Sequence, residues 1–262
     1  MIGELRGTEH HPQARIVLAT ALEAGPSHAY LFHGPAGTGK RTAAKAFAAE
    51  LLAEGSPEPD AVRHRVYAGT HPDLTWVRPS GAHVMRVGDV DGPVVAAATR
   101  TPFESSRRVF VLERVDTMND EVANRLLKTL EEPASYVHLV LLTDALGSVI
   151  ETVISRCQLV RFDPLPAAHL AQLLEGEGIP AERAGACARL ALGNAARARY
   201  LASPEGEALR GDVETFVAAA LSGEAVADEP WRPLLERAES RRAEAEEECA
   251  AERKERLELE PK

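Results

Sequence analysis

The stretch "LFHGPAGTGKRT", Leu31–Thr42, decides the fold of this 262-residue chain. Apolar residues before its first glycine predict a short buried strand over 28–34, and the alanine-rich stretch after it predicts a helix over 41–54. A strand, a glycine loop and a helix in this order form the phosphate-binding loop GxxxxGK(S/T), whose backbone N–H groups attract phosphate. The residues of this loop that would meet a nucleotide are Gly34, Pro35, Gly37, Thr38, Gly39, Lys40, Arg41 and Thr42.

The residue after the loop lysine departs from this motif. The motif places a Ser or Thr hydroxyl there as a ligand for Mg²⁺, whereas the chain has Arg41, which cannot ligate a cation. Thr42 lies about 100° further round the helix. Two interpretations stay open: the loop is a glycine turn without a ligand, or it holds ATP or ADP without hydrolysing it.

A second apolar strand, "RRVFVLERVD" over 107–116, carries the other half of a nucleotide site. In phosphate-loop enzymes such a strand ends in acidic residues that hold the metal and polarise the attacking water. Glu113 takes the first of these places and Arg114 the second. A guanidinium stays protonated in proteins, so Arg114 cannot act as a base, and a surface ion pair is its alternative role. Asp116 comes two residues late, and we therefore expect poor ATP hydrolysis by this chain alone.

Apolar strands alternate with helices along the first part of the chain. The stretch before the strand expected at 71–79 is loose and polar. Pro93 opens a helix, and Asn119 is a plausible cap for a helix that Pro133 ends. Uninterrupted apolar strands are typical of a parallel sheet covered on both faces, so we predict an α/β fold with a five-stranded parallel sheet. The expected strands cover residues 28–34, 71–79, 107–116, 137–144 and 158–162.

Beyond residue 165 the strand pattern stops. Short helical stretches predict a small all-α unit over 166–206, and a longer, highly charged helical region follows over 207–262. We interpret the charged tail as a solvent-exposed helix with ion pairs between residues four apart. A coiled-coil partner is the alternative, although no sustained apolar heptad supports it.

Composition and charge exclude several classes of protein. A net charge of −10 argues against a chain that grips nucleic acid over its whole surface. The cysteines Cys157, Cys187 and Cys249 are far apart, which favours neither a disulfide framework nor a zinc site. No apolar run approaches the ~20 residues of a membrane span, and the N-terminus has no apolar signal core, so we expect a cytoplasmic protein without membrane contact.

Four motifs occur in one order along the chain and carry a family resemblance. They are "HAYLFHGPAGTGK" (28–40), "GTHPDL" (69–74), "ANRLLKTLEEP" (123–133) and "TVISRC" (152–157). On these motifs the chain resembles the delta-prime subunits of the bacterial DNA polymerase III clamp loader, within the AAA+ superfamily, closely over 1–206 and loosely beyond. The resemblance implies an AAA+ phosphate-loop domain over 1–165, a helical lid over 166–206 and the start of a helical collar over 207–262, with the collar truncated.

The resemblance also implies partners and residue roles. Subunits of this family form a five-membered ring with tau/gamma and delta subunits, which loads the sliding clamp onto primed DNA through the assembled complex. The arginine of their Ser-Arg-Cys motif, here Arg156, reaches into the ATP site of a neighbouring tau/gamma subunit as an arginine finger. A cap or a local carboxylate pair is the alternative for Arg156. Thr143 takes the place of the sensor-1 residue and Arg197 that of sensor 2.

The chain departs from the family at its zinc module. Related subunits usually carry four clustered cysteines between the phosphate loop and "HPDL", where this chain has none. His64 and His71 alone cannot complete a tetrahedral site, so we predict no bound zinc. The runner-up function is a working ATPase of the tau/gamma type that uses Lys40 and recruits Thr42 and Asp116. A stand-alone DNA-binding protein is a third, weaker reading, because no aromatic and basic platform is evident.

Overall fold

The computed structural model describes residues 5–81, 84–222 and 229–259. It divides into two compact units, which are described separately. The first comprises residues 1–169 with 192–195, and the second comprises residues 170–191 with 196–262. No helix within the described residues is both long enough and apolar enough to cross a membrane.

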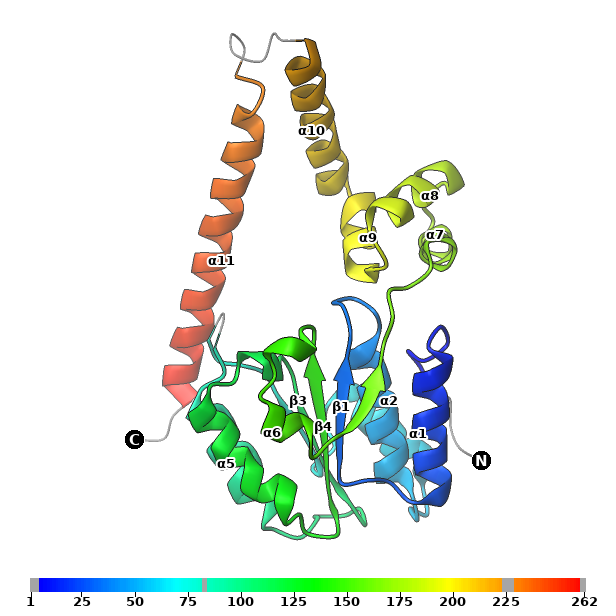
Figure 1. The fold of residues 1–262 in the computed structure, drawn as a ribbon, viewed down its shortest axis with the longest axis vertical. Helices are drawn as coiled ribbons and strands as arrows, with labels where there is room; N and C mark the ends of the chain where they lie inside the picture. Colours follow the sequence, from blue (N-terminus) through cyan, green and yellow to red (C-terminus); the bar gives the residue numbers. More distant parts are fainter. Residues whose placement is uncertain (1–4, 82–83, 223–228, 260–262) are drawn as a thin grey trace. The chain divides into compact units, whose positions relative to one another are not determined.

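A parallel sheet forms the centre of the first unit (Figure 1). Among the described residues its five strands follow the spatial order β2-β3-β4-β1-β5, and every neighbouring pair runs parallel. This confirms the predicted α/β fold class. The strands are β1 (Ala29–His33), β2 (Leu74–Val77), β3 (Arg108–Leu112), β4 (Val137–Thr143) and β5 (Gln158–Arg161).

Helices cover both faces of this sheet. Alternate residues of a strand point to opposite faces, so each strand contributes side chains to both layers of the core. Tyr30 and Phe32 pack on one face in a core with Leu18 and Phe47, whereas Leu31 packs on the other. The helices on the Tyr30 face are α1 (Pro12–Ala24), α2 (Lys40–Ala53) and α3 (Pro59–Ala68). Those on the Leu31 face are α4 (Val87–Val90), the π-helical turn Asp91–Ala96, α5 (Asp120–Glu131) and α6 (Glu151–Ile154).

Two local predictions differ from the structure and one is confirmed. The stretch expected to be loose contains α3, which has Pro59 in its first turn and left-handed Gly69 (φ 74°) at its end. The helix expected to open at Pro93 begins earlier, with α4 and the π-helical turn. Asn119 caps α5 as predicted, since its Oδ1 accepts the N–H of Val122 at 3.0 Å.

The second unit is helical throughout its described secondary structure. An ion pair of 2.6 Å between Arg237 and Asp212 joins its two longest helices, and Arg241 lies 4.3 Å from the ring centre of Tyr200. The exposed tail carries the expected ion pairs between residues four apart, such as Arg242 with Glu246 at 2.9 Å. Its helices are α7 (Ala167–Gly176), α8 (Ala181–Leu190), α9 (Ala195–Ala202), α10 (Pro204–Ser222) and α11 (Arg232–Leu259), of which α7 and α9 begin within the first unit.

Candidate functional site

The phosphate loop joins β1 to α2 at the carboxyl edge of the sheet and depends on its glycines. Gly34, Gly37 and Gly39 have φ angles of 143°, 73° and 98°, which residues with a side chain rarely adopt. A Cβ on Gly34 would lie 1.9 Å from the carbonyl oxygen of Phe162, and one on Gly37 would lie 2.0 Å from Oδ1 of Asn194. The loop is therefore packed tightly against its surroundings, as well as shaped like an anion site.

Lys40 is buried at the start of α2 and has three oxygen partners. Its Nζ donates to the carbonyl oxygens of Gly34 and Pro35, both at 2.6 Å, and forms an ion pair of 2.7 Å with Asp144. An ammonium group has three protons, so these contacts use all of its donors. A phosphate that enters the loop must therefore exchange with at least one of these oxygens.

A buried histidine, His11, contacts the backbone of the phosphate loop. Nε2 of His11 lies 2.7 Å from the carbonyl oxygen of Thr38, and the imidazole packs on Phe162 with 4.8 Å between ring centres. Burial lowers the pKa of His11 below its ordinary value, so the neutral ring with a proton on Nε2 fits this contact near pH 7.

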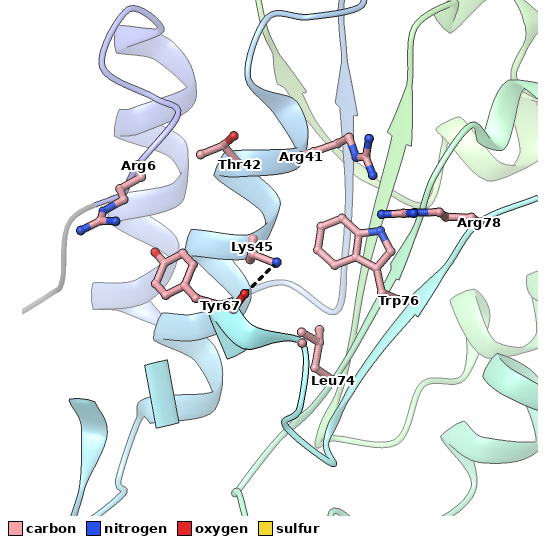
Figure 2. Close-up of a pocket in the computed structure, with 9 residues that line it drawn as sticks. Arg6, Arg41, Thr42, Lys45, Tyr67, Leu74, Trp76 and Arg78 are labelled. Atoms are coloured by element: carbon pink, nitrogen blue, oxygen red, sulfur yellow. Dashed lines mark hydrogen bonds between the residues drawn. The ribbon is translucent and has the colours of Figure 1, made fainter. Parts of the chain in front are cut away.

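Arg41 and Glu113, which both depart from the motif, contact each other. The guanidinium NH2 of Arg41 lies 3.0 Å from Oε1 of Glu113, a carboxylate that is 11% exposed. The same oxygen accepts the indole N–H of Trp76 and a hydrogen bond of 3.3 Å from Nε of Arg78. Figure 2 shows the side chains of Arg41, Arg78 and Trp76 converging.

This donor set does not fit a magnesium ion. Magnesium needs oxygen ligands in near-octahedral order, and phosphate-loop enzymes supply them from a hydroxyl and a carboxylate. Here the guanidinium of Arg41 stands in place of the hydroxyl and occupies the carboxylate oxygen of Glu113. The chain's own guanidinium therefore takes the place of the exchangeable metal ion that other phosphate-loop proteins bind.

The alternative ligands Thr42 and Asp116 are also placed elsewhere. Thr42 lines a hollow beside α2 with Arg6 and Tyr67 (Figure 2). Asp116 lies in a short 3-10 turn after β3, where its Oδ1 accepts the hydroxyl of Thr143 at 2.8 Å. The hydroxyl of Thr143, the sensor-1 candidate, also accepts the N–H of Ala145 at 3.0 Å, so both functions of this hydroxyl are used.

Arg114 and Arg197 are the remaining predicted residues of the nucleotide site. Arg114 is exposed and has the left-handed backbone conformation (φ 53°) that begins the 3-10 turn. Thr117 donates its N–H and its hydroxyl to the carbonyl oxygen of Arg114, at 2.9 and 2.7 Å. Arg197 lies in α9, within the second unit, and its sensor-2 role stays a prediction.

Arg156 follows α6 and links two of the sequence motifs. Its NH2 lies 2.5 Å from Oε1 of Glu131, in "LLKTLEEP", and its NH1 donates to the carbonyl oxygen of Thr152 at 2.9 Å. Both side chains of the pair are accessible, with 34% of Arg156 and 48% of Glu131 exposed. Burial raises the pKa of the neighbouring Cys157 thiol to about 12, so this cysteine is a packing residue rather than a nucleophile.

Sequence reasoning missed several residues of these clusters. Asp144 directly follows β4, and strand ends at a carboxyl edge are where site residues gather, so its position was a usable signal. Trp76 and Arg78 are two residues apart near the end of β2 and share a face, which the period of a strand predicts. Glu131 gave no such signal. No group of three or more potential metal ligands occurs within the described part of the chain, and the absence of zinc stays a prediction.

The sheet order, the loop between β1 and α2 and the helices that follow define the class as α/β proteins with a phosphate-loop fold. A solved structure of a DNA polymerase III gamma-subunit-related protein from Thermotoga maritima has this fold. It matches with a TM-score of 0.50 at 18% identity, over 86% of this chain and 72% of that chain.

The family model described as DNA polymerase III, delta subunit, matches residues 10–166, and the chain belongs to this family. It is 35% identical over 178 residues to the DNA polymerase III subunit delta' of Bacillus subtilis, covering 66% of this chain and 54% of that protein. It is 36% identical over 173 residues to the corresponding protein of Pseudomonas aeruginosa, covering 63% and 51%. The chain thus spans about half the length of these curated relatives, and the resemblance to delta-prime subunits is confirmed.

Proposed function

We propose that this chain is a clamp-loader subunit of the delta-prime kind that does not hydrolyse ATP itself. The ion pair of 3.0 Å between Arg41 and Glu113 carries this proposal. Arg41 replaces the hydroxyl ligand of a catalytic magnesium ion, and its guanidinium also engages an oxygen of the carboxylate that would be the second protein ligand. Arg114, at the place of the general base, cannot accept a proton.

The phosphate loop keeps the chemistry for holding a nucleotide. Its backbone N–H groups, the start of α2 and the ammonium of Lys40 all favour an anion. The guanidinium of Arg41 would add the positive charge that a metal supplies in hydrolysing relatives. Bound ATP or ADP would then be a resting ligand, and its turnover would need a metal and a base that these residues do not provide.

In this proposal Arg156 acts on the ATP of a neighbouring tau/gamma subunit. A guanidinium stabilises charge that develops on the transferred phosphoryl group, an effect worth about 10³–10⁵ in rate in studied cases. The accessible pair with Glu131 holds Arg156 at the surface until a phosphate replaces the carboxylate. Delta, the sliding clamp and primed DNA are the further partners that this role requires.

A reconstituted loader tests the proposal. This subunit would be combined with tau/gamma, delta, clamp and primed DNA, with either Arg156→Ala or the control Arg161→Ala, which removes an exposed arginine paired with Asp163. We expect Arg156→Ala to lower single-turnover hydrolysis at the neighbouring site by about 10³-fold or more, while the ring still assembles. Unchanged hydrolysis and clamp loading would reject the finger.

The isolated chain tests the other half of the proposal. We expect no ATP turnover above that of the Lys40→Ala variant. A clear rate that Lys40→Ala abolishes would instead establish the working-ATPase alternative. A loader that works normally with Lys40→Ala would agree with a holding or structural role for the loop.

A further inference from the structure

A hollow lined by basic side chains lies beside the phosphate loop in the first unit. It has a volume of 750 Å³ and opens between α2, the end of α3 and β2 (Figure 2). We call it the basic hollow. Its lining residues are Arg6, Arg41, Thr42, Lys45, Tyr67, Gly69, Leu74, Trp76 and Arg78, and none of residues 34–40 is among them.

Positive charge dominates this surface of an otherwise acidic chain. Four cationic side chains line the hollow, and no lining residue is acidic among those the structure describes. Glu113 adjoins it and is shared by Arg41, Arg78 and Trp76 through one oxygen. Two of these cations, Arg41 and Arg78, share this single carboxylate, and their side chains remain 59% and 67% exposed. The hollow therefore attracts an anion.

Two aromatic rings lie within the same hollow. The ammonium of Lys45 is 5.9 Å from the ring centre of Trp76, and the guanidinium of Arg6 is 5.6 Å from that of Tyr67. Two fixed contacts limit movement here: the indole N–H of Trp76 donates to Glu113, and Nζ of Lys45 donates to the carbonyl oxygen of Tyr67 at 3.0 Å. The rings thus offer apolar faces at set positions beside the cations.

We infer that the basic hollow binds a nucleoside phosphate. Arginine and lysine side chains recognise phosphate oxygens, and nucleic-acid bases stack on aromatic faces. A volume of 750 Å³ falls within the range of about 300–1,000 Å³ that is usual for small-ligand sites. The phosphate is placed among Arg41, Lys45 and Arg78, and the base against Trp76. The ligand is either a free nucleotide or one nucleotide of a DNA strand.

This inference does not depend on the arginine finger or on the state of the phosphate loop. It does connect the two sites, because Arg41 borders both of them. An anion in the basic hollow would compete with Glu113 for the guanidinium of Arg41.

Fluorescence of Trp76 provides the test. The chain has two tryptophans, so Trp231→Phe leaves Trp76 as the reporter. This variant would be titrated with a nucleoside monophosphate, a thymidine oligonucleotide and inorganic phosphate, each in EDTA. We expect saturable quenching by the first two that weakens with added salt. Equal binding per nucleotide identifies free nucleotide as the source, and much tighter binding of the oligonucleotide identifies a strand.

Two matched lysine variants locate the site. Lys45→Met removes a charge from the basic hollow, and Lys128→Met removes an exposed charge from α5, on the other face of the sheet. We expect Lys45→Met to weaken the nucleoside phosphate about tenfold and Lys128→Met to leave its affinity unchanged. Unaltered affinity in Lys45→Met would overturn the inference. Absence of quenching by every ligand would overturn it as well.

Discussion

The phosphate loop and the Ser-Arg-Cys segment of the first unit each hold a cationic side chain, but they hold it in opposite ways. Lys40 is 6% exposed and is held by two carbonyl oxygens and Asp144. Arg156 is 34% exposed, and the carboxylate partners of both cations are half-exposed, so the difference lies in the burial of the cations themselves. Exposed ion pairs contribute little to stability, so Arg156 can change partner at small cost, whereas Lys40 cannot. The difference suggests a loop kept for structure and an arginine kept for exchange.

The largest effect should come from the loop backbone. Gly34→Ala would place a Cβ 1.9 Å from the carbonyl oxygen of Phe162 at a φ of 143°. We expect a loss of about 4 kcal/mol or more in the free energy of unfolding, measured by urea denaturation, because the backbone on both sides must shift. Gly147→Ala is the control, since its Cβ would meet nothing within 4 Å. Equal stability of the two variants would show that the loop is loosely held.

Removing the buried ammonium is the next test. Lys40→Met keeps the apolar stem of the side chain but leaves two carbonyl oxygens and Asp144 without their donor. We expect a loss of about 2–3 kcal/mol in the free energy of unfolding, since breaking charged hydrogen bonds of a buried group is costly. Lys45→Met, one turn further along α2, is the control. A stabilised Lys40→Met variant would contradict a structural role for this lysine.

The metal dependence of nucleotide binding tests the pair that separates this loop from a working one. With Arg41 at the metal position, we expect the ATP affinity of the native chain to change less than about twofold between Mg²⁺ and EDTA, a small free-energy difference. The double variant Arg41→Thr with Glu113→Asp restores a hydroxyl and a shorter carboxylate. Its affinity should rise about tenfold with Mg²⁺, as followed by calorimetry.

A matched double variant makes this result specific. Arg78 also contacts Glu113, at 3.3 Å, but it lies next to β2 rather than on α2. Arg78→Thr with Glu113→Asp should therefore gain no dependence on magnesium. A native chain that needs Mg²⁺ for ATP would show that Arg41 leaves the position when nucleotide binds.

How far the sequence predicts these sites follows from the distance along the chain between the residues involved. The strand, loop and helix from residue 28 to 54 are local, so composition and glycine spacing predict them, and the five strands follow from apolar runs. The defects at Arg41 and Glu113 are visible separately in the motifs. Their ion pair is not visible, because it depends on the strand order, in which only β4 separates β3 from the strand that leads into the loop.

The partner of Arg156 shows the same limit. Glu131 and Arg156 belong to separate motifs and are 25 residues apart, and only the packing of α5 against α6 brings them together. A local carboxylate was one alternative for Arg156, but no spacing rule selects Glu131 over its neighbour Glu132. Side-chain pairs between elements depend on tertiary packing, which periodicity does not encode.

The smallest effect should come from the ion pair between Arg156 and Glu131. Weakening this pair tests directly whether Arg156 changes partner. Glu131→Gln keeps the size of the side chain and removes its charge, so we expect a loss below about 1 kcal/mol in the free energy of unfolding. In the reconstituted loader, the same variant should hydrolyse ATP at least as fast as the native subunit, because Arg156 no longer has to leave a carboxylate. Glu132→Gln, beside it on the chain, serves as the control. A Glu131→Gln loader as slow as the Arg156→Ala loader would mean that Glu131 positions Arg156 for the ATP site of the neighbouring subunit. Arg156 and Lys40 would then differ in where they lie, and not in how strongly their partners hold them.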